Sequence, residues 1–285
     1  AIAKGLISSP RYHYTGPALS QTGGHGDARP NHLDICVCGS HSVEVVDGVD
    51  ALRKAVRTRF FKGAHAIKIM TSGGVISPSD PIRIPQYSAE EIQAVVDEAR
   101  RRGSYVAAHA YSPEAIVHSV SNGVRTIEHG NLLDDVSAQA MAASGAFLVP
   151  TLAAYDAMAR FGDTIALTES GKAKNAEVLH AGVSAVERAH RFGIPIAFGS
   201  DLMGALHSEQ LHGIRLQSEA QNPFQLLKSL TSVGAEILQA EDVGVIRPGA
   251  FGDLLVVGGN PFERPELLWE PSPTRVVILG GAPVE

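Results

Sequence analysis

The chain has 285 residues, of which 44% are hydrophobic and 19% are charged. This composition supplies enough apolar side chains for a large core and excludes an intrinsically disordered chain. The net charge of −6 also argues against a general nucleic-acid binder, which normally carries a basic domain.

The two cysteines, Cys36 and Cys38, are separated by a single residue and make a poor disulfide pair. A metal pair is the alternative, but no further cysteine is available to complete a soft site. The first ten residues lack the layout of a signal peptide, and no stretch approaches the roughly 18 apolar residues of a membrane span. We therefore expect a soluble, cytoplasmic protein without a membrane partner.

Apolar runs that favour β-structure alternate with helical patterns along most of the chain. The predicted strands are 64–70, 105–110, 124–128, 146–151 and 194–200. The predicted helices are 88–102, 113–121, 134–144, 172–192 and 223–230. The first of these is the clearest, because Ser88 and Glu91 match a capping box and Gly103 supplies a stop. Strand–helix alternation at this spacing predicts βαβ units and a parallel sheet, either open or closed into a barrel.

The tail has a different pattern. Residues 245–285 contain two short β patterns, IRPGAFGDLLVVGGNPF and TRVVILGGAPV, separated by a proline-rich segment. We expect a boundary near residue 240, with 1–240 forming the α/β unit and 241–285 contributing to a small β domain.

Four polar side chains stand at or near the carboxyl ends of the predicted strands. They are Lys68, His109, His129 and Asp201. In a parallel α/β barrel these ends form the catalytic face, so four strands would deliver these groups to one rim.

Each of the four residues also has an ordinary explanation when it is taken alone. A histidine at a strand end is often a hydrogen-bonded structural residue, Lys68 could pair with an acid, and Asp201 could cap a helix. Taken together, the imidazoles and the carboxylate are suitable ligands for Zn²⁺ or a similar ion. Lysine is the exception, since an ammonium group repels a cation unless it is neutral or converted into an anion.

The phrases around these residues resemble the amidohydrolase superfamily. They are KIMTSGG with Lys68, AHAY with His109, IEHGN with His129 and GSDLMG with Asp201. LSQTGGHGD, SGGVISPSDP and PGAFGDLLVVGGNP support the resemblance, which runs from end to end of the chain. It is strongest to the metal-dependent dipeptidases, which include Xaa-Pro dipeptidases (prolidases) and Xaa-Arg/Lys carboxypeptidases; imidazolonepropionase is a more distant relative. The resemblance implies a TIM-like (β/α)8 barrel with a small β-sandwich appendage.

The same resemblance implies a binuclear zinc site. Lys68 would carry a carbamate that bridges two Zn²⁺ ions, Asp201 would bind the first ion, and His109 and His129 the second. Hydroxide held between the ions would attack the scissile carbonyl, and Asp201 would pass its proton to the leaving amine. The implied substrates are dipeptides or N-acyl amino acids, and a homo-oligomer is an open possibility.

The superfamily normally carries a His-x-His motif on its first barrel strand, and this sequence contains none. We expect that the sequence begins after the first two strands, so that it is a fragment of the enzyme. The alternatives are a protein with one metal ion and weak activity, or an inactive barrel that serves as a binding partner. On the same scaffold, hydrolysis of a cyclic amide or lactone is a competing activity.

Three further residues are candidates for contact with the substrate. Tyr111 follows His109 by two residues and would point to the same side of a continuing strand. His25 lies with Asp27 in the glycine-rich loop after the first visible strand, and His207 follows the Asp201 loop. Packing at a loop, a surface turn and a helix cap are the respective structural alternatives.

Overall fold

The computed structural model describes residues 2–4, 6–7, 9–27, 29, 42–77 and 80–284. Cys36 and Cys38 lie outside these residues. A parallel sheet of six strands, in the order β2-β1-β3-β4-β5-β6, forms the centre of the molecule. The strands are β1 (Ala18–Ser20), β2 (Val43–Val45), β3 (Ile67–Met70), β4 (Val106–Ala110), β5 (Thr126–His129) and β6 (Phe147–Val149). The predicted α/β architecture with a parallel sheet is confirmed, and no ladder joins β2 to β6 among the described residues.

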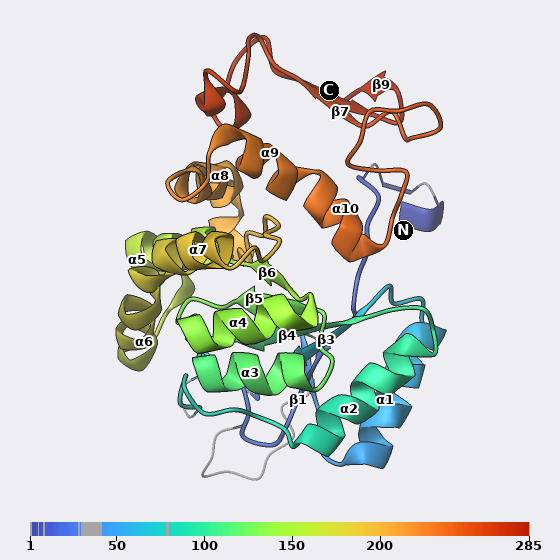
Figure 1. The fold of residues 1–285 in the computed structure, drawn as a ribbon, viewed down its shortest axis with the longest axis vertical. Coiled ribbons are helices and arrows are strands. Elements are labelled where there is room, and N and C mark those ends of the chain that lie inside the picture. The colour runs from blue at the N-terminus through green and yellow to red at the C-terminus, as the bar shows by residue number, and fades with distance from the viewer. Residues whose placement is uncertain are drawn as a thin grey trace.

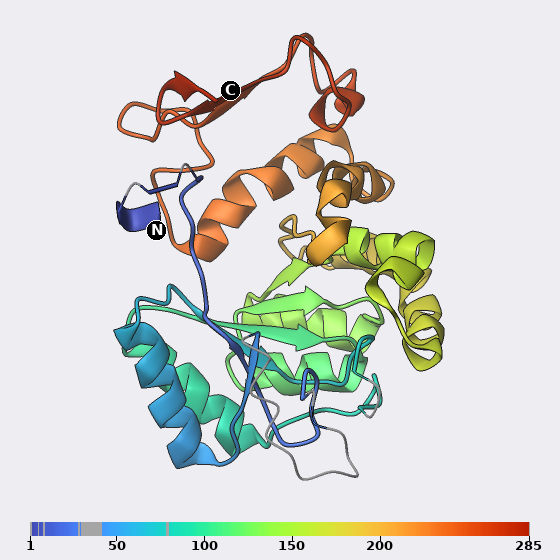
Figure 2. The ribbon, with the colours of Figure 1, turned by 180° about the vertical axis from the view of Figure 1, so that it is seen from behind.

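Helices cover one face of this sheet. Figure 2 shows the strands in front of α3 and α4, which pack side by side behind them. The α-helices are α1 (Val49–Phe61), α2 (Ala89–Arg100), α3 (Pro113–Ser121), α4 (Asp135–Ser144), α5 (Leu152–Phe161), α6 (Glu169–Leu179), α7 (Ala181–Arg191), α8 (Gln210–Ser218), α9 (Pro223–Leu230) and α10 (Ser232–Leu238). The 3₁₀ helices are η1 (Ile2–Lys4), η2 (Gly162–Ile165), η3 (Gly204–Glu209) and η4 (Pro265–Leu268). The predicted capping box of α2 is present, with Ser88 and Glu91 bonding each other's backbone N–H.

Strand alternation separates the core from the polar face. Ile67 and Ile69 of β3 are fully buried in the main apolar cluster, as are Ala108 of β4 and Ile127 of β5. Successive side chains on a strand point to opposite faces, so Lys68 projects from the face opposite to Ile67 and Ile69. The sheet therefore keeps its apolar side chains on one face and presents Lys68 on the other.

Two predicted elements differ from the structure. Residues 194–200 make a single parallel bridge, Leu148 to Ile196, instead of a strand. Pro195 lacks a backbone N–H and cannot take part fully in a ladder. The predicted helix 172–192 divides at His180 into α6 and α7, which lets α6 pack on α5 while α7 packs on α4.

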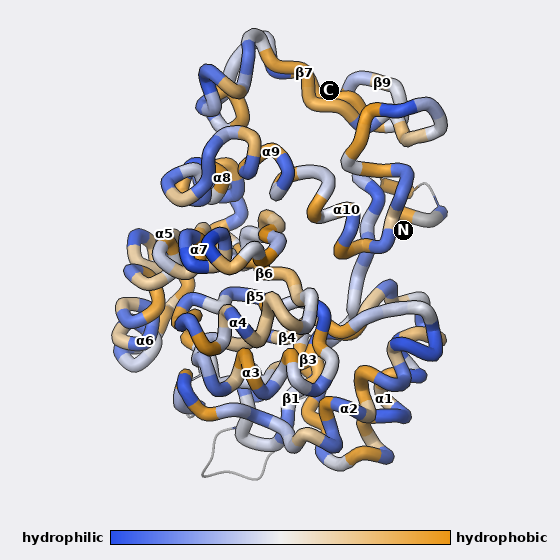
Figure 3. The backbone as a smooth tube through the Cα atoms, in the orientation of Figure 1, coloured by the Kyte–Doolittle hydropathy of each residue, from blue (hydrophilic) through white to orange (hydrophobic). Residues whose placement is uncertain are grey.

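A separate three-stranded antiparallel sheet, β7-β8-β9, lies near the C-terminus. Its strands are β7 (Leu254–Val256), β8 (Val276–Leu279) and β9 (Ala282–Pro283). Figure 1 shows this sheet beyond α9 and α10, at the same end of the molecule as the N-terminus. Arg11 from the N-terminal segment forms an ion pair with Asp253 and lies over the Phe251 ring. Apolar residues dominate β7 in Figure 3.

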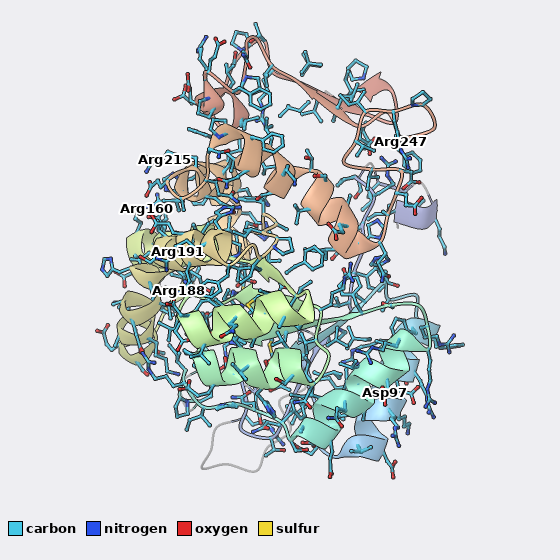
Figure 4. The ribbon with its side chains drawn as sticks, viewed as in Figure 1. Asp97, Arg160, Arg188, Arg191, Arg215 and Arg247 are labelled. Atoms are coloured by element: carbon cyan, nitrogen blue, oxygen red, sulfur yellow. The ribbon has the colours of Figure 1, made fainter. Side chains whose placement is uncertain are left out.

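Ion pairs join neighbouring helices on the outer surface. Arg188 of α7 bonds Asp135 of α4, and Arg160 of α5 bonds Asp156 and Glu209. Both arginines are labelled along one side of the molecule in Figure 4. In the described part of the chain, none of the helices has the length and apolar character that a membrane span requires.

Candidate active site

The site lies at the carboxyl ends of β3, β4 and β5. The register pairs Met70 with His109 and Ala110 with His129, so the two histidines leave adjacent strands at nearly the same level. Alternation alone would send the His129 side chain toward the helices, because its partner Ala110 lies in the core. The left-handed φ of 79° at His129 breaks this alternation. Its ring consequently meets that of His109, with a centroid separation of 4.6 Å.

Both imidazoles are buried and held in the neutral state. Burial lowers the pKa of His109 and of His129 well below the ordinary value, and the positive charge of Lys68 lowers both further. Protonation is therefore unfavourable at neutral pH. Neutral imidazole is the form that binds metal ions.

One ring nitrogen of each histidine is fixed by a hydrogen bond. His109 Nε2 donates to the carbonyl oxygen of Gly73 at 3.1 Å, which leaves the lone pair on Nδ1. His129 Nδ1 lies 2.7 Å from Thr151 Oγ1. Neither remaining nitrogen has a hydrogen bond to the residues that the structure describes. This is the pattern of a metal-binding histidine, whose second nitrogen is usually held by a carbonyl or another polar group.

Lys68 and Asp201 bring opposite charges to the same face. Lys68 is half-buried, and its charge acts on both imidazoles and on the Asp201 carboxylate. Loss of surrounding water raises the pKa of Asp201, while attraction to Lys68 opposes that rise. The Asp201 residue as a whole is exposed, whereas its carboxylate is largely removed from water, so Asp201 lies at the edge of the site with its acid group turned inward.

Backbone strain is concentrated here. His129, Thr151 and Asp201 all adopt left-handed φ values, of 79°, 46° and 49°. This conformation is unfavourable for residues with a side chain, and most of all for a β-branched residue such as Thr151. Such strain persists where surrounding contacts enforce it, and it occurs preferentially at functional sites.

Tyr111, predicted to contact substrate, is part of a buried hydroxyl network. Its OH lies 2.9 Å from the OH of Tyr155, and Thr151 Oγ1 donates to the Tyr155 OH at 3.4 Å. Thr151 thus connects His129 to the two tyrosines. Burial raises the pKa of both phenols, which keeps them protonated and able to donate.

His25 also reaches the site. Its ring stacks on that of His109 with a centroid separation of 4.2 Å and an interplanar angle of 13°. His207 does not reach it, because it is exposed on η3 and points away while its neighbour Leu206 is buried. Consecutive side chains on a 3₁₀ helix diverge by about 120°, so Leu206 and His207 cannot both face inward.

A cavity of about 30 Å³ lies between these side chains. Five of the predicted residues line it, and the rest of the wall is apolar. The lining residues are His25, His109, Tyr111, His129, Asp201, Val75, Ile76, Ala154, Met158, Met203 and Leu206. The space holds about one water-sized molecule, so a larger ligand requires the wall to move.

Sequence reasoning missed four residues that support the site. Thr151 is a polar residue at the end of a predicted strand, and a polar residue in that position is the same feature that marks His129. Asp80 lies in the SGGVISPSDP phrase, whereas Tyr155 and Lys174 lie on helices without any pattern that marks them. Among the described residues, no group of three or more His, Cys, Asp or Glu side chains is gathered closely enough to hold a metal ion.

Solved structures of hydrolases have the same fold as this chain. A prolidase in complex with N-methylphosphonate-L-proline is 44% identical, with a TM-score of 0.96, over 100% of this chain and 72% of that chain. A Xaa-Pro dipeptidase with methionine bound in its active site is 32% identical, with a TM-score of 0.88, over 100% of this chain and 70% of that chain.

The sequence is also similar to that of a characterised enzyme and to a protein-family model. Ochratoxinase from Aspergillus niger is 30% identical over 99% of this chain, which spans only 61% of the length of that enzyme. The Amidohydrolase family profile matches residues 1–284, and enzymes of that family generally use metal ions. The chain belongs to the amidohydrolase family.

Proposed function

We propose that the protein is a metal-dependent hydrolase that cleaves the amide bond of Xaa-Pro dipeptides or N-acyl amino acids. The observation that carries this proposal is the pair of buried, neutral imidazoles at adjacent strand ends, each with one nitrogen fixed by a hydrogen bond. The likeness to a prolidase that binds a proline phosphonate supports the choice of substrate.

The donor set fits divalent ions such as Zn²⁺. His109 Nδ1 and His129 Nε2 offer lone pairs, and Asp201 offers a carboxylate. We propose that Lys68 carries a carbamate, because an unmodified ammonium group whose charge acts on all three ligands would repel the ion. When bound, such ions polarise carbonyl groups and acidify water.

The remaining steps belong to side chains of this chain. Asp201, in the wall of the cavity, accepts a proton from the attacking water and delivers it to the leaving amine. Tyr111 donates a hydrogen bond to the substrate carbonyl oxygen or carboxylate, and its raised pKa keeps that proton in place. His25 faces the same cavity and provides a second polar contact.

The apolar wall of the cavity favours a substrate with an apolar side chain. Val75, Met158 and Leu206 border the cavity and exclude water from the polar groups. Because the cavity is far smaller than the roughly 300 Å³ or more of an ordinary ligand pocket, we propose that η3, which carries Leu206, moves when a dipeptide enters. We also propose that the substrate carries an apolar side chain.

We also propose that residues 1–240 form the hydrolase unit and that 241–285 belong to a small β domain. We propose further that the protein acts in the cytoplasm. Self-association is a further proposal, to be tested by the mass of the protein in solution.

Substrate screening of the metal-loaded protein tests the function. Hydrolysis of Xaa-Pro dipeptides and N-acyl-prolines, abolished by a chelator and restored by Zn²⁺, is the expected result. Turnover confined to lactones or cyclic amides would contradict the proposal, as would the absence of turnover with the metal site filled.

A further inference from the structure

The imidazole of His25 is held by a nearly fully buried carboxylate. Asp80 Oδ2 lies 3.0 Å from His25 Nδ1 and also accepts from the backbone N–H of Gly74 at 2.9 Å. The Asp80 side chain is only 1% exposed. Ser77 Oγ lies 3.1 Å from the same nitrogen and can either donate or accept. The Asp80 carboxylate only accepts, so it is Asp80 that favours the form of His25 with the hydrogen on Nδ1.

Asp80 and its loop are in turn anchored by Lys174, nearly one hundred residues later in the chain. From α6, Lys174 Nζ donates to the carbonyl oxygens of Gly74, Ser77 and Asp80, at 3.0, 2.6 and 2.7 Å. Nζ also lies 3.5 Å from Asp80 Oδ1. An ammonium group has three N–H donors, and here all three are used on one short loop.

The faces of the His25 ring are also constrained. One contact is the stacked ring of His109, and another is the backbone of Gly74. A Cβ added at Gly74 would lie 2.1 Å from His25 Cε1, so this close approach requires glycine. With Nδ1 bonded to Asp80, the unoccupied ring nitrogen is Nε2.

We propose that Asp80 and Lys174 are positioning residues that act through His25. Lys174 fixes the loop from α6, Asp80 fixes the tautomer and the angle of the imidazole, and His25 then presents Nε2 to the carbonyl or carboxylate of the substrate. The contribution of this arrangement to catalysis rests on the proposed function, but the arrangement of His25 itself does not.

Four variants test the kinetic part: Lys174→Met, Asp80→Leu, His25→Ala and the double variant His25→Ala/Lys174→Met. Misplacement of a group that contacts the substrate can cost up to about 100-fold in rate, so we expect Lys174→Met and Asp80→Leu to lower kcat/KM by about 10- to 100-fold with the metal content unchanged. The double variant should be no slower than His25→Ala, because Lys174 acts through His25. Effects that multiply would overturn the proposal.

Lys172→Met is the matched control. Lys172 lies on the same helix, but it bonds Asp163 and Glu169 on the exposed surface. We expect its kcat/KM to equal that of the wild type. An equal loss in Lys172→Met and Lys174→Met would contradict a specific role for Lys174. If Lys174→Met does not fold, Asp80→Leu and the double variant His25→Ala/Asp80→Leu complete the same cycle.

A spectroscopic measurement separates this proposal from the proposed function. Imidazole ¹⁵N NMR of the wild type, with His25 assigned by the His25→Ala variant, should show the hydrogen on Nδ1. Asp80→Leu, which has no acceptor, should lose that signature. If the signature persists in Asp80→Leu, the positioning proposal fails even where the enzyme is active. If the signature behaves as expected but no amide is hydrolysed, only the proposed function fails.

Discussion

Replacing Thr151 with valine removes one hydroxyl group and leaves the shape of the side chain nearly unchanged. Thr151 Oγ1 lies 2.7 Å from His129 Nδ1, and the residue is buried. Valine has no atom that bonds to Nδ1. The His129 ring therefore loses the contact that fixes its orientation.

The size of the effect follows from that lost bond. A buried polar group left unsatisfied costs about 1–3 kcal/mol, which corresponds to about 5- to 150-fold in an equilibrium constant. Loss of a group that orients a metal-binding histidine typically costs 10- to 100-fold in metal affinity. We expect Zn²⁺ affinity to fall by about this factor in Thr151→Val.

Titration of the metal-free protein with Zn²⁺ against a competing chelator measures the affinity. Thr151→Ser is the matched control, because serine keeps the hydroxyl and adopts the left-handed backbone with less strain than a β-branched residue. Its affinity should stay within about threefold of the wild type, well inside the range that loss of a hydrogen bond would give. Wild-type affinity in Thr151→Val, or equal losses in both variants, would refute the reasoning.

Three other predictions follow from the same site. Lys68→Ala should lose bound metal and turnover, with partial recovery on addition of a small carboxylate; full metal content in that variant would exclude a bridging role. Asp201→Asn should lower kcat by about 100-fold or more with a smaller change in KM, since it removes the proton carrier, and an unchanged kcat would exclude it as the base. Because His109 and His129 have lowered pKa values, the unfolded chain binds protons near pH 6.5 that the folded metal-free protein does not. The free energy of unfolding in urea should therefore be highest above about pH 7 and fall as the pH drops below about 6.5, and a flat profile across pH 5–8 would contradict their burial as neutral groups.

The sequence predicts elements well where the signal is local. Ser88 and Glu91 mark the start of α2, and the apolar runs of β3 to β5 are long enough to identify each strand. β1 and β2 have only three residues each, and no pattern distinguished α1 or α5. At 194–200 the apolar run suggested a strand, but Pro195 limits its pairing to a bridge.

The site residues are also predictable only where their signal is local. Lys68, His109 and His129 are polar residues in or beside apolar strands, and that pattern alone marks them. The residues that support the site contact it from distant segments of the chain. Lys174, for example, donates a hydrogen bond to a loop nearly one hundred positions earlier. Nothing local in α6 marks Lys174 rather than Lys172, because only the fold decides which lysine faces the loop. The turn of His129 toward His109 depends on a left-handed backbone that strand alternation does not predict.

The central claim is that these side chains form a metal-dependent amide hydrolase. The most direct test is hydrolysis of a Xaa-Pro dipeptide by the purified protein, measured as isolated, after complete removal of metal, and after reconstitution with Zn²⁺. The account predicts turnover that disappears with the metal and returns in proportion to the Zn²⁺ bound. Equal turnover in the metal-free protein, or none in the fully reconstituted one, would contradict it.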